Sequence, residues 1–295
     1  AEELTVIPGA EEVLALLELR THALSDLWDV IVVDCAPTAE TLRLLALPEA
    51  LGWYMTRVFP VERRVVRALR PVLSRAAGVP MPGESVFDAV EGLHADLHEV
   101  QQILASPGST VRLVLTPETV VVAEARRSLT TLSLYGYRVD GVIANRVFPD
   151  GEGDAWRDGW VAAQARVLAE VGQSFAALPI WRSAYQSGEP VGADALAAFA
   201  DAAYDGADPL AVPDGAGPMT IARTTGGAVL RIDLPFATRE DVDLARHGED
   251  LVVTVGSYRR LLSLPAALAR HEVAGARVEG GSLQVRFRLV QEVSS

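Results

Sequence analysis

Apolar and polar positions along the chain recur with periods that predict an α/β region followed by an all-β region. Val30 to Val33 form a run of β-branched residues that is too short for a helix and ends at Asp34. Such a run is typical of a strand buried on both faces of a parallel sheet. Apolar residues between Glu11 and Ala23 recur with helical spacing, so we expect a helix there that leads into this strand.

A strand, a helix and a second strand are predicted over residues 111–144. Residues 111–116 form a β-branched and leucine-rich run. Thr116 is predicted to cap a helix that begins at Pro117 and continues to about residue 134, because proline favours the first helical position. Gly136 should end this helix, and residues 138–144 should form the next strand.

The second half of the chain changes character after residue 205. Residues 150–205 predict a helix, a short strand near Pro179 and another helix. Residues 206–218 are rich in glycine, proline and aspartate, which is typical of a linker. Beyond them, short runs alternate apolar and polar positions, as half-exposed antiparallel strands do, and predict an all-β sandwich over 219–295. These runs are residues 228–234, 251–255, 258–264 and 282–289.

Composition narrows the function classes. The net charge of −13 over 295 residues argues against general nucleic-acid binding, which relies on basic side chains. Cys35 is the one cysteine, so the chain has no internal disulfide and no Cys-x-x-Cys zinc site. No stretch approaches 18 uncharged apolar residues. We therefore expect a globular, cytoplasmic protein.

Two further groups carry alternative interpretations. His94 and His98 are spaced i, i+4, which suits zinc, but without an obvious third ligand we expect surface histidines. Arginines interleave with apolar residues from Arg57 to Arg75. This basic amphipathic stretch suggests transient contact with a hydrophobic client or a membrane surface. The alternative is a solvated helix face whose apolar side lies in the core.

Asp34 is the first candidate for chemistry. A carboxylate at the carboxyl end of a strand, followed by a helix start, is how nucleotide-hydrolysing folds hold Mg²⁺ and sense a phosphate. Pro37 breaks the strand, and Thr38 or Thr41 could cap the next helix. The alternative is a buried strand that ends in a turn aspartate.

Residues 34–43 read Asp-Cys-Ala-Pro-Thr-Ala-Glu-Thr-Leu-Arg. This segment resembles switch II of the anion-transporting ATPase family, which comprises arsenite-efflux and tail-anchored-protein-targeting ATPases. Seven of the ten positions agree with the family pattern, and the departures are Cys35, Ala39 and Glu40. The loss of glycine at position 39 puts the free movement of this loop on nucleotide exchange in doubt.

The resemblance implies an α/β fold of the P-loop class over residues 1–205, with a helical insertion at about 44–106. It implies ATP and Mg²⁺ as cofactors. Asp34 would hold a water on Mg²⁺ as the metal site. The backbone of Pro37 and Thr38 would sense the γ-phosphate, and Thr41 would cap the responding helix.

A second part of the resemblance concerns the nucleotide base. Residues 141–146 resemble the family strand that ends in the asparagine reading adenine, which implies that Asn145 contacts the base and that Arg146 flanks it. Pro179, Ile180 and Trp181 resemble the family segment that leads into the adenine-pocket loop. The alternatives are a turn residue for Asn145 and a sheet edge for the other three.

The 295 residues contain no lysine, although the family's P-loop needs one to reach the β- and γ-phosphates. We expect the parent protein to carry that loop before residue 1. The alternative is a non-catalytic scaffold subunit that holds a client and pairs with a P-loop-bearing homologue. The family works as a two-fold pair, which implies a homodimer or a heterodimer with a related ATPase subunit. Arsenite transport is less favoured, because one cysteine cannot supply grouped thiolates.

Residues 264–283 resemble the small heat-shock, or α-crystallin-like, domain that some family members carry at the carboxyl terminus. A chaperone role would imply an exposed strand edge that binds other chains. The alternative is a structural appendage that packs on the ATPase domain.

Overall fold

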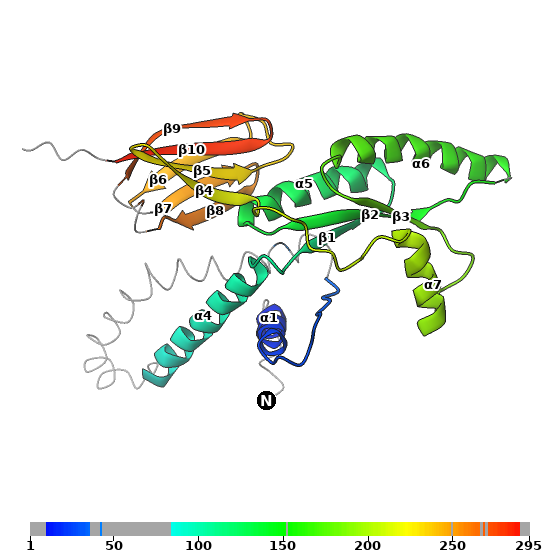
Figure 1. Cartoon of the computed structure of the whole chain (residues 1–295), viewed down its shortest axis with the longest axis horizontal. Helices are drawn as coiled ribbons and strands as arrows, with labels where there is room; N and C mark the ends of the chain where they lie inside the picture. The colour runs from blue at the N-terminus through cyan, green and yellow to red at the C-terminus, as the bar shows by residue number, and fades with distance from the viewer. Residues whose placement is uncertain are drawn as a thin grey trace, which may run out of the picture. The chain divides into compact units, whose positions relative to one another are not determined.

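The computed structural model describes residues 10–35, 42, 84–151, 153–248, 250–265, 268 and 271–289. The chain divides into two compact units, residues 1–106 and residues 107–295. Figure 1 shows the helices and strands of both units. Pro37, Thr38 and Thr41 lie outside the described residues, as does the arginine stretch from Arg57 to Arg75.

The first unit pairs two helices, α1 (Ala10–Ala23) and α4 (Glu84–Leu104). Leu16 of α1 packs with Leu97 and Val100 of α4, and all three are buried. At the edge of this contact, Arg20 Nε donates a hydrogen bond of 2.7 Å to Glu99. The helix predicted between residues 11 and 23 is confirmed.

The strand predicted for Val30 to Val33 is wrong for the described structure. These residues have no strand partner in the described part of the chain. Their side chains are exposed, up to 84% at Val32. A β-branched run becomes a buried strand only when neighbouring strands satisfy its backbone and layers cover both faces. Among the described residues the segment pairs with no strand, because the described parallel sheet consists of β1, β2 and β3, all within residues 111–184.

The second unit opens with a three-stranded parallel sheet of order β1-β2-β3. Its strands are β1 (Val111–Leu115), β2 (Val139–Val147) and β3 (Ile180–Ala184). Helices α5 (Thr119–Tyr135), α6 (Ala155–Ser174) and α7 (Ala193–Tyr204) complete this part. α5 and α6 pack on β2, and α7 packs on β3 (Figure 1). The α/β class predicted from the sequence is confirmed.

The start of α5 differs from the prediction by two residues. Glu118 is the N-cap, in an extended conformation, and no side chain caps the helix. The Thr116 hydroxyl bonds instead to the Glu118 carboxylate at 3.0 Å. The end of the helix agrees with the prediction, because Gly136 adopts a left-handed φ of 86° that residues with a Cβ rarely adopt.

Residues 219–289 form a β-sandwich, as predicted. One sheet has the order β4-β5-β10-β9 and the other the order β6-β7-β8, and all pairs are antiparallel. The strands are β4 (Met219–Thr224), β5 (Gly227–Asp233), β6 (Val242–His247), β7 (Asp250–Val255), β8 (Tyr258–Ser263), β9 (His271–Glu279) and β10 (Ser282–Leu289). Inward-facing residues such as Ile232, Leu251 and Val285 are fully buried between the sheets.

The sandwich core continues into the α/β part through α5. Leu134 of α5 is fully buried and belongs to the same apolar cluster as the sandwich residues. The guanidinium of Arg260, only 6% exposed, donates to the Leu134 carbonyl at the end of α5. The Thr130 hydroxyl also donates to the carbonyl of Pro235. The structure therefore favours the interpretation that the sandwich packs on the α/β part.

None of the helices in the described ranges is long and apolar enough to cross a membrane.

Candidate functional site

The carboxyl end of β2 is irregular at the residues predicted to read a base. The pairing of β2 with β3 shifts register between Ala144 and Val147, so Asn145 and Arg146 form a bulge. Arg146 has a φ of 57°, which is uncommon for a residue with a Cβ. The Asn145 Oδ1 accepts a hydrogen bond of 2.9 Å from the Arg146 amide. The local backbone thus orients the Asn145 carboxamide.

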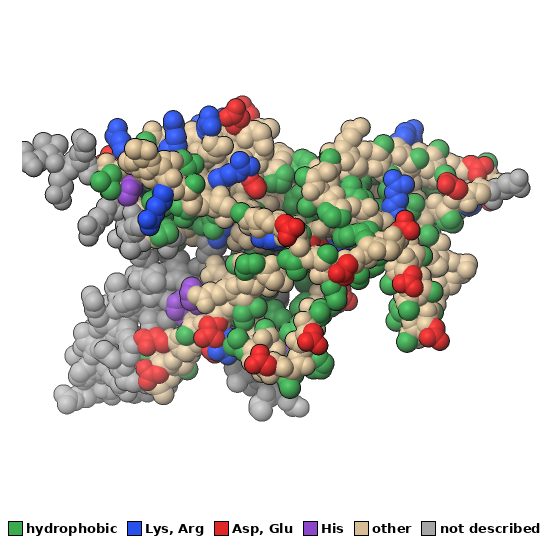
Figure 2. All heavy atoms as spheres, in the orientation of Figure 1, with side chains coloured by type: hydrophobic (Ala, Val, Ile, Leu, Met, Phe, Trp, Pro, Cys, Tyr) green, Lys and Arg blue, Asp and Glu red, His purple; other side chains and the backbone are tan. Residues whose placement is uncertain are grey.

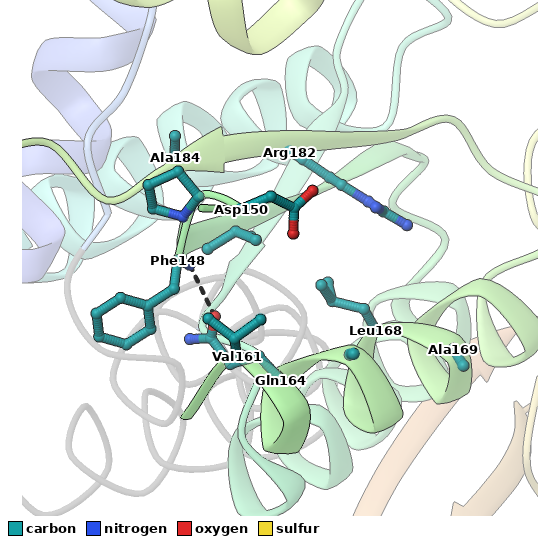
Figure 3. Close-up of a pocket in the computed structure, with 11 residues that line it drawn as sticks. Phe148, Asp150, Val161, Gln164, Leu168, Ala169, Arg182 and Ala184 are labelled. Atoms are coloured by element: carbon teal, nitrogen blue, oxygen red, sulfur yellow. Dashed lines mark hydrogen bonds between the residues drawn. The ribbon is translucent and has the colours of Figure 1, made fainter. Parts of the chain in front are cut away.

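Gln164 of α6 holds this bulge in place. Its side chain is 6% exposed. Its Oε1 accepts from the Phe148 amide at 2.8 Å, which is the dashed line in Figure 3. Its Nε2 donates to the Arg146 carbonyl at 3.1 Å. The Gln164 side-chain amide thus makes one hydrogen bond as donor and one as acceptor, both to the backbone at the end of β2. The end of the strand is therefore fixed to α6, which suits a binding site that has to be rigid.

A cavity of about 400 Å³ lies beside this strand end. Arg182 of β3 and Asp150 contribute charged groups to its lining, and Leu168 contributes an apolar wall (Figure 3). Its size falls in the range of small-molecule sites. The other lining residues are Val147, Phe148, Pro149, Val161, Gln164, Ala165, Ala169 and Ala184.

The structure does not bring Pro179, Ile180 and Trp181 to this end of the sheet. The Val142 amide donates to the Pro179 carbonyl at 2.9 Å, and Ile180 pairs with Val142. Because β2 and β3 are parallel, Ile180 lies level with Val142, three strand positions before Asn145 and roughly 10 Å from it along the strand. The loop that leaves β3 at the carboxyl end starts at Tyr185. The adenine role of Pro179, Ile180 and Trp181 stays a prediction that this geometry does not favour.

Trp181 belongs to a separate cluster near the amino ends of the strands. The Arg112 guanidinium lies 4.7 Å from its ring centroid and donates to the Tyr204 hydroxyl at 3.0 Å. It also binds both carboxylate oxygens of Asp140, which is 5% exposed, at 3.1 and 2.8 Å. Partial burial alone would lower the pKa of Arg112, but the hydrogen bonds and charges of Asp140 and Tyr204 raise it. These contacts attach α7 to the sheet and give Trp181 a structural environment.

Asp34 lies in the first unit, on the exposed segment that follows α1. Among the described residues, no group of three histidine, cysteine or acidic side chains could hold a metal ion. Mg²⁺ often takes one or two carboxylates together with phosphate oxygens and water. A single exposed carboxylate such as Asp34 fits that donor set.

Within the described residues, His94 and His98 of α4 belong to no group of three side chains that could hold a metal ion. Burial of the His94 side chain, and then the charge of His98, lower the pKa of His94. The His94 Nδ1 is buried and has no hydrogen-bond partner among the residues that the structure describes. His94 therefore favours its neutral form, which is typical of a half-buried structural histidine.

Sequence reasoning missed several residues at the carboxyl end of the sheet. Gln164 carries no motif, and its role depends on α6 lying against the bulge. The rings of Phe148, Trp156, Trp160 and Tyr185 gather at the same end. The i, i+4 spacing of the two tryptophans after a predicted strand was an available signal.

Comparisons with known proteins cover both parts of the chain. A family model described as "Anion-transporting ATPase" matches residues 1–205. A second, described as "HSP20-like domain found in ArsA", matches residues 225–287.

Individual relatives extend over most of the chain. An uncharacterised protein of Streptomyces coelicolor is 39% identical over 295 residues, covering 97% of this chain and 72% of that protein. A Chlorobaculum tepidum protein named "Putative arsenical pump-driving ATPase" is 32% identical over 296 residues, which cover 99% of this chain and 73% of that protein. A Trypanosoma cruzi protein named "ATPase ASNA1 homolog" is 28% identical over 200 residues, which cover 66% of this chain and 55% of that protein.

Proposed function

The chain belongs to the anion-transporting ATPase family, and from this premise we propose that it takes part in binding and hydrolysing ATP with Mg²⁺. Nucleotide-driven closure of a dimer would then act on a hydrophobic protein client or at a membrane surface. The observation that carries the proposal is the bulge at the carboxyl end of β2. There the Asn145 Oδ1 accepts from the Arg146 amide, and Gln164 holds the Arg146 carbonyl of the same bulge.

Each candidate residue has a role that its chemistry allows. Asp34 offers a carboxylate for Mg²⁺, which would neutralise charge on the phosphates. Asn145 offers an amide donor and an acceptor to a base edge. Pro37, Thr38 and Thr41 are proposed for the phosphate-sensing segment on sequence alone.

The phosphate-binding lysine is the group that these residues cannot supply, because the 295 residues contain none. It has to come from residues outside them in the same protein or from a related subunit. The second case is the alternative function, in which this chain is a client-holding scaffold that pairs with a catalytic homologue.

The family alone does not identify the species that the ATPase transports or delivers. The Chlorobaculum relative is named for driving an arsenical pump. Arsenic(III) prefers several thiolates, and Cys35 is the one cysteine of this chain. We therefore favour a protein client over a thiolate-bound arsenical as the species on which the ATPase acts.

The test compares ATP and GTP binding by the full-length protein, with and without Mg²⁺, in wild type and Asn145→Asp. The aspartate keeps an oxygen that accepts from the Arg146 amide but loses the amide donor. Loss of one such hydrogen bond costs roughly 0.5–1.5 kcal/mol, so ATP affinity should fall about two- to tenfold and the preference over GTP should narrow.

The matched control is Gln173→Glu, the same amide-to-acid change on an exposed position of α6. It should leave both affinities unchanged. If Asn145→Asp binds ATP and GTP as the wild type does, Asn145 does not read the base. Sedimentation with and without ATP tests the dimer separately.

A further inference from the structure

Four aromatic side chains lie together at the carboxyl end of the sheet, and we call this surface the aromatic ledge. They are Phe148, Trp156, Trp160 and Tyr185. The Phe148 and Tyr185 rings stack with centroids 5.3 Å apart and planes 3° apart. Phe148 also meets Trp156 and Trp160 at 6.1 and 6.4 Å, and the two tryptophans lie 6.3 Å from each other. The ledge is therefore one continuous aromatic surface built from three separate segments.

Much of this surface faces solvent. Trp156 is 65% exposed, Tyr185 51% and Trp160 37%. Clustered exposed aromatic side chains are unusual on a protein surface without a binding role, and tryptophan and tyrosine are enriched among residues that dominate interface energies.

The backbone around the ledge is held rigidly. Gln164 accepts from the Phe148 amide at 2.8 Å. The Arg157 guanidinium donates to the carbonyls of Pro149 and Gly151, the latter at 2.7 Å. Asp154 caps α6 by accepting from the Arg157 amide at 2.9 Å. Because this backbone is already ordered, a partner that docks here would cause little further loss of conformational entropy.

The segments that carry the ledge are strongly acidic. Residues 148–160 contain four carboxylates and residues 185–194 contain two, against one arginine. That arginine, Arg157, is occupied with loop carbonyls. Acidic side chains are visible around the start of α6 and on α7 (Figure 2). Arg182 lines the neighbouring cavity, and the Phe148 ring points away from it (Figure 3).

We propose that the aromatic ledge docks an arginine- or lysine-bearing segment of a basic partner protein. A guanidinium or ammonium group is attracted to the face of an indole or phenol ring, and nearby carboxylates add to the attraction. A second copy of this chain that docked ledge to ledge would bring two acidic surfaces together. The inference stands independently of nucleotide binding.

The experiment measures binding of a fluorescein-labelled peptide of alternating glycine and arginine to the full-length protein by fluorescence anisotropy. Trp156→Ala should weaken binding about three- to tenfold, from the loss of one exposed cation–π contact. The matched control is Trp28→Ala, which removes a tryptophan that is 60% exposed in the first unit, and it should leave binding unchanged.

A second variant tests the charge without altering a ring. Asp158→Asn combined with Glu189→Gln should weaken binding and reduce its dependence on salt, whereas Glu11→Gln with Glu18→Gln should not. A peptide of alternating glycine and glutamate should fail to bind. Equal losses for Trp156→Ala and Trp28→Ala would overturn the proposal. So would self-association in sedimentation that Trp156→Ala abolishes while the arginine peptide leaves it unaffected.

Discussion

Replacing Gly141 by alanine should displace the Trp181 ring and destabilise the unit that contains β1, β2 and β3. An ideal Cβ at position 141 would lie 2.3 Å from Cζ3 and 2.8 Å from Cη2 of Trp181, and 3.1 Å from the Pro179 carbonyl oxygen. Atoms in proteins do not approach a Cβ so closely, so the ring or the strand pairing has to move.

The ring cannot move freely. It meets the Tyr204 ring at a centroid distance of 5.3 Å and carries the Arg112 guanidinium at 4.7 Å. Displacing the ring loosens the contacts that attach α7 to β3. Overpacking of this kind costs typically 1–3 kcal/mol, and we expect about 2 kcal/mol for Gly141→Ala.

Urea denaturation followed by far-ultraviolet circular dichroism measures this loss as a lower midpoint. Gly159→Ala is the matched control, because Gly159 lies within α6 and its added Cβ meets nothing within 4 Å. That control should be neutral or stabilising by up to about 1 kcal/mol, since alanine favours the helix.

A double mutant decides whether the Trp181 ring is the cause. In a Trp181→Ala background the obstructing ring is absent, so adding Gly141→Ala should cost close to nothing, giving a coupling of about the full single-mutant loss. The reasoning is refuted if Gly141→Ala is as harmless as Gly159→Ala, or if its cost persists without the ring.

Three further outcomes follow from buried or partly buried groups. Arg260→Met should cost about 1–3 kcal/mol, because it leaves the Leu134 carbonyl buried without this donor, and calorimetry should show a lower melting temperature. Gly227→Ala should be more damaging than a typical surface change, because its Cβ would lie 2.0 Å from the Phe287 carbonyl oxygen; a drop of several degrees in the same scan would confirm it. Burial lowers the pKa of His94, so the unfolded state takes up the proton first and the α1–α4 unit should lose stability as pH falls below the ordinary value of 6.5; His94→Gln should flatten that dependence in urea titrations.

Much of the fold could be predicted because local pattern and tertiary context agree. The runs at 111–115 and 139–147 form strands as expected. The second pairs with a strand on each side, and α5 packs on both. Gly136 could be placed because only a left-handed residue ends α5 in this way. The alternating runs of the sandwich identified β5, β7, β8 and β10 for the same reason.

Other features depended on information that local sequence lacks. Val30 to Val33 have ideal strand composition, but their state depends on which strands lie beside them. Pro179 to Trp181 lie where β3 begins, because the strand starts at Ile180 and the predicted one was centred near Pro179; their adenine role stays a prediction. Gln164 could not be predicted, since its function as a brace exists only once α6 packs against the bulge.

The shared core of α5 and the sandwich has a mechanical consequence. Leu134 and Arg260 join the two parts at the same end of α5, so the sandwich is linked to the α/β part by packing as well as by the 206–218 connection. A rotation of α5 would swing the outer strands of the sandwich through a wider arc than the helix itself travels. The displacement of the outer strands would therefore exceed that of α5, and a fluorophore on β9 would report rotations of α5 through this larger displacement.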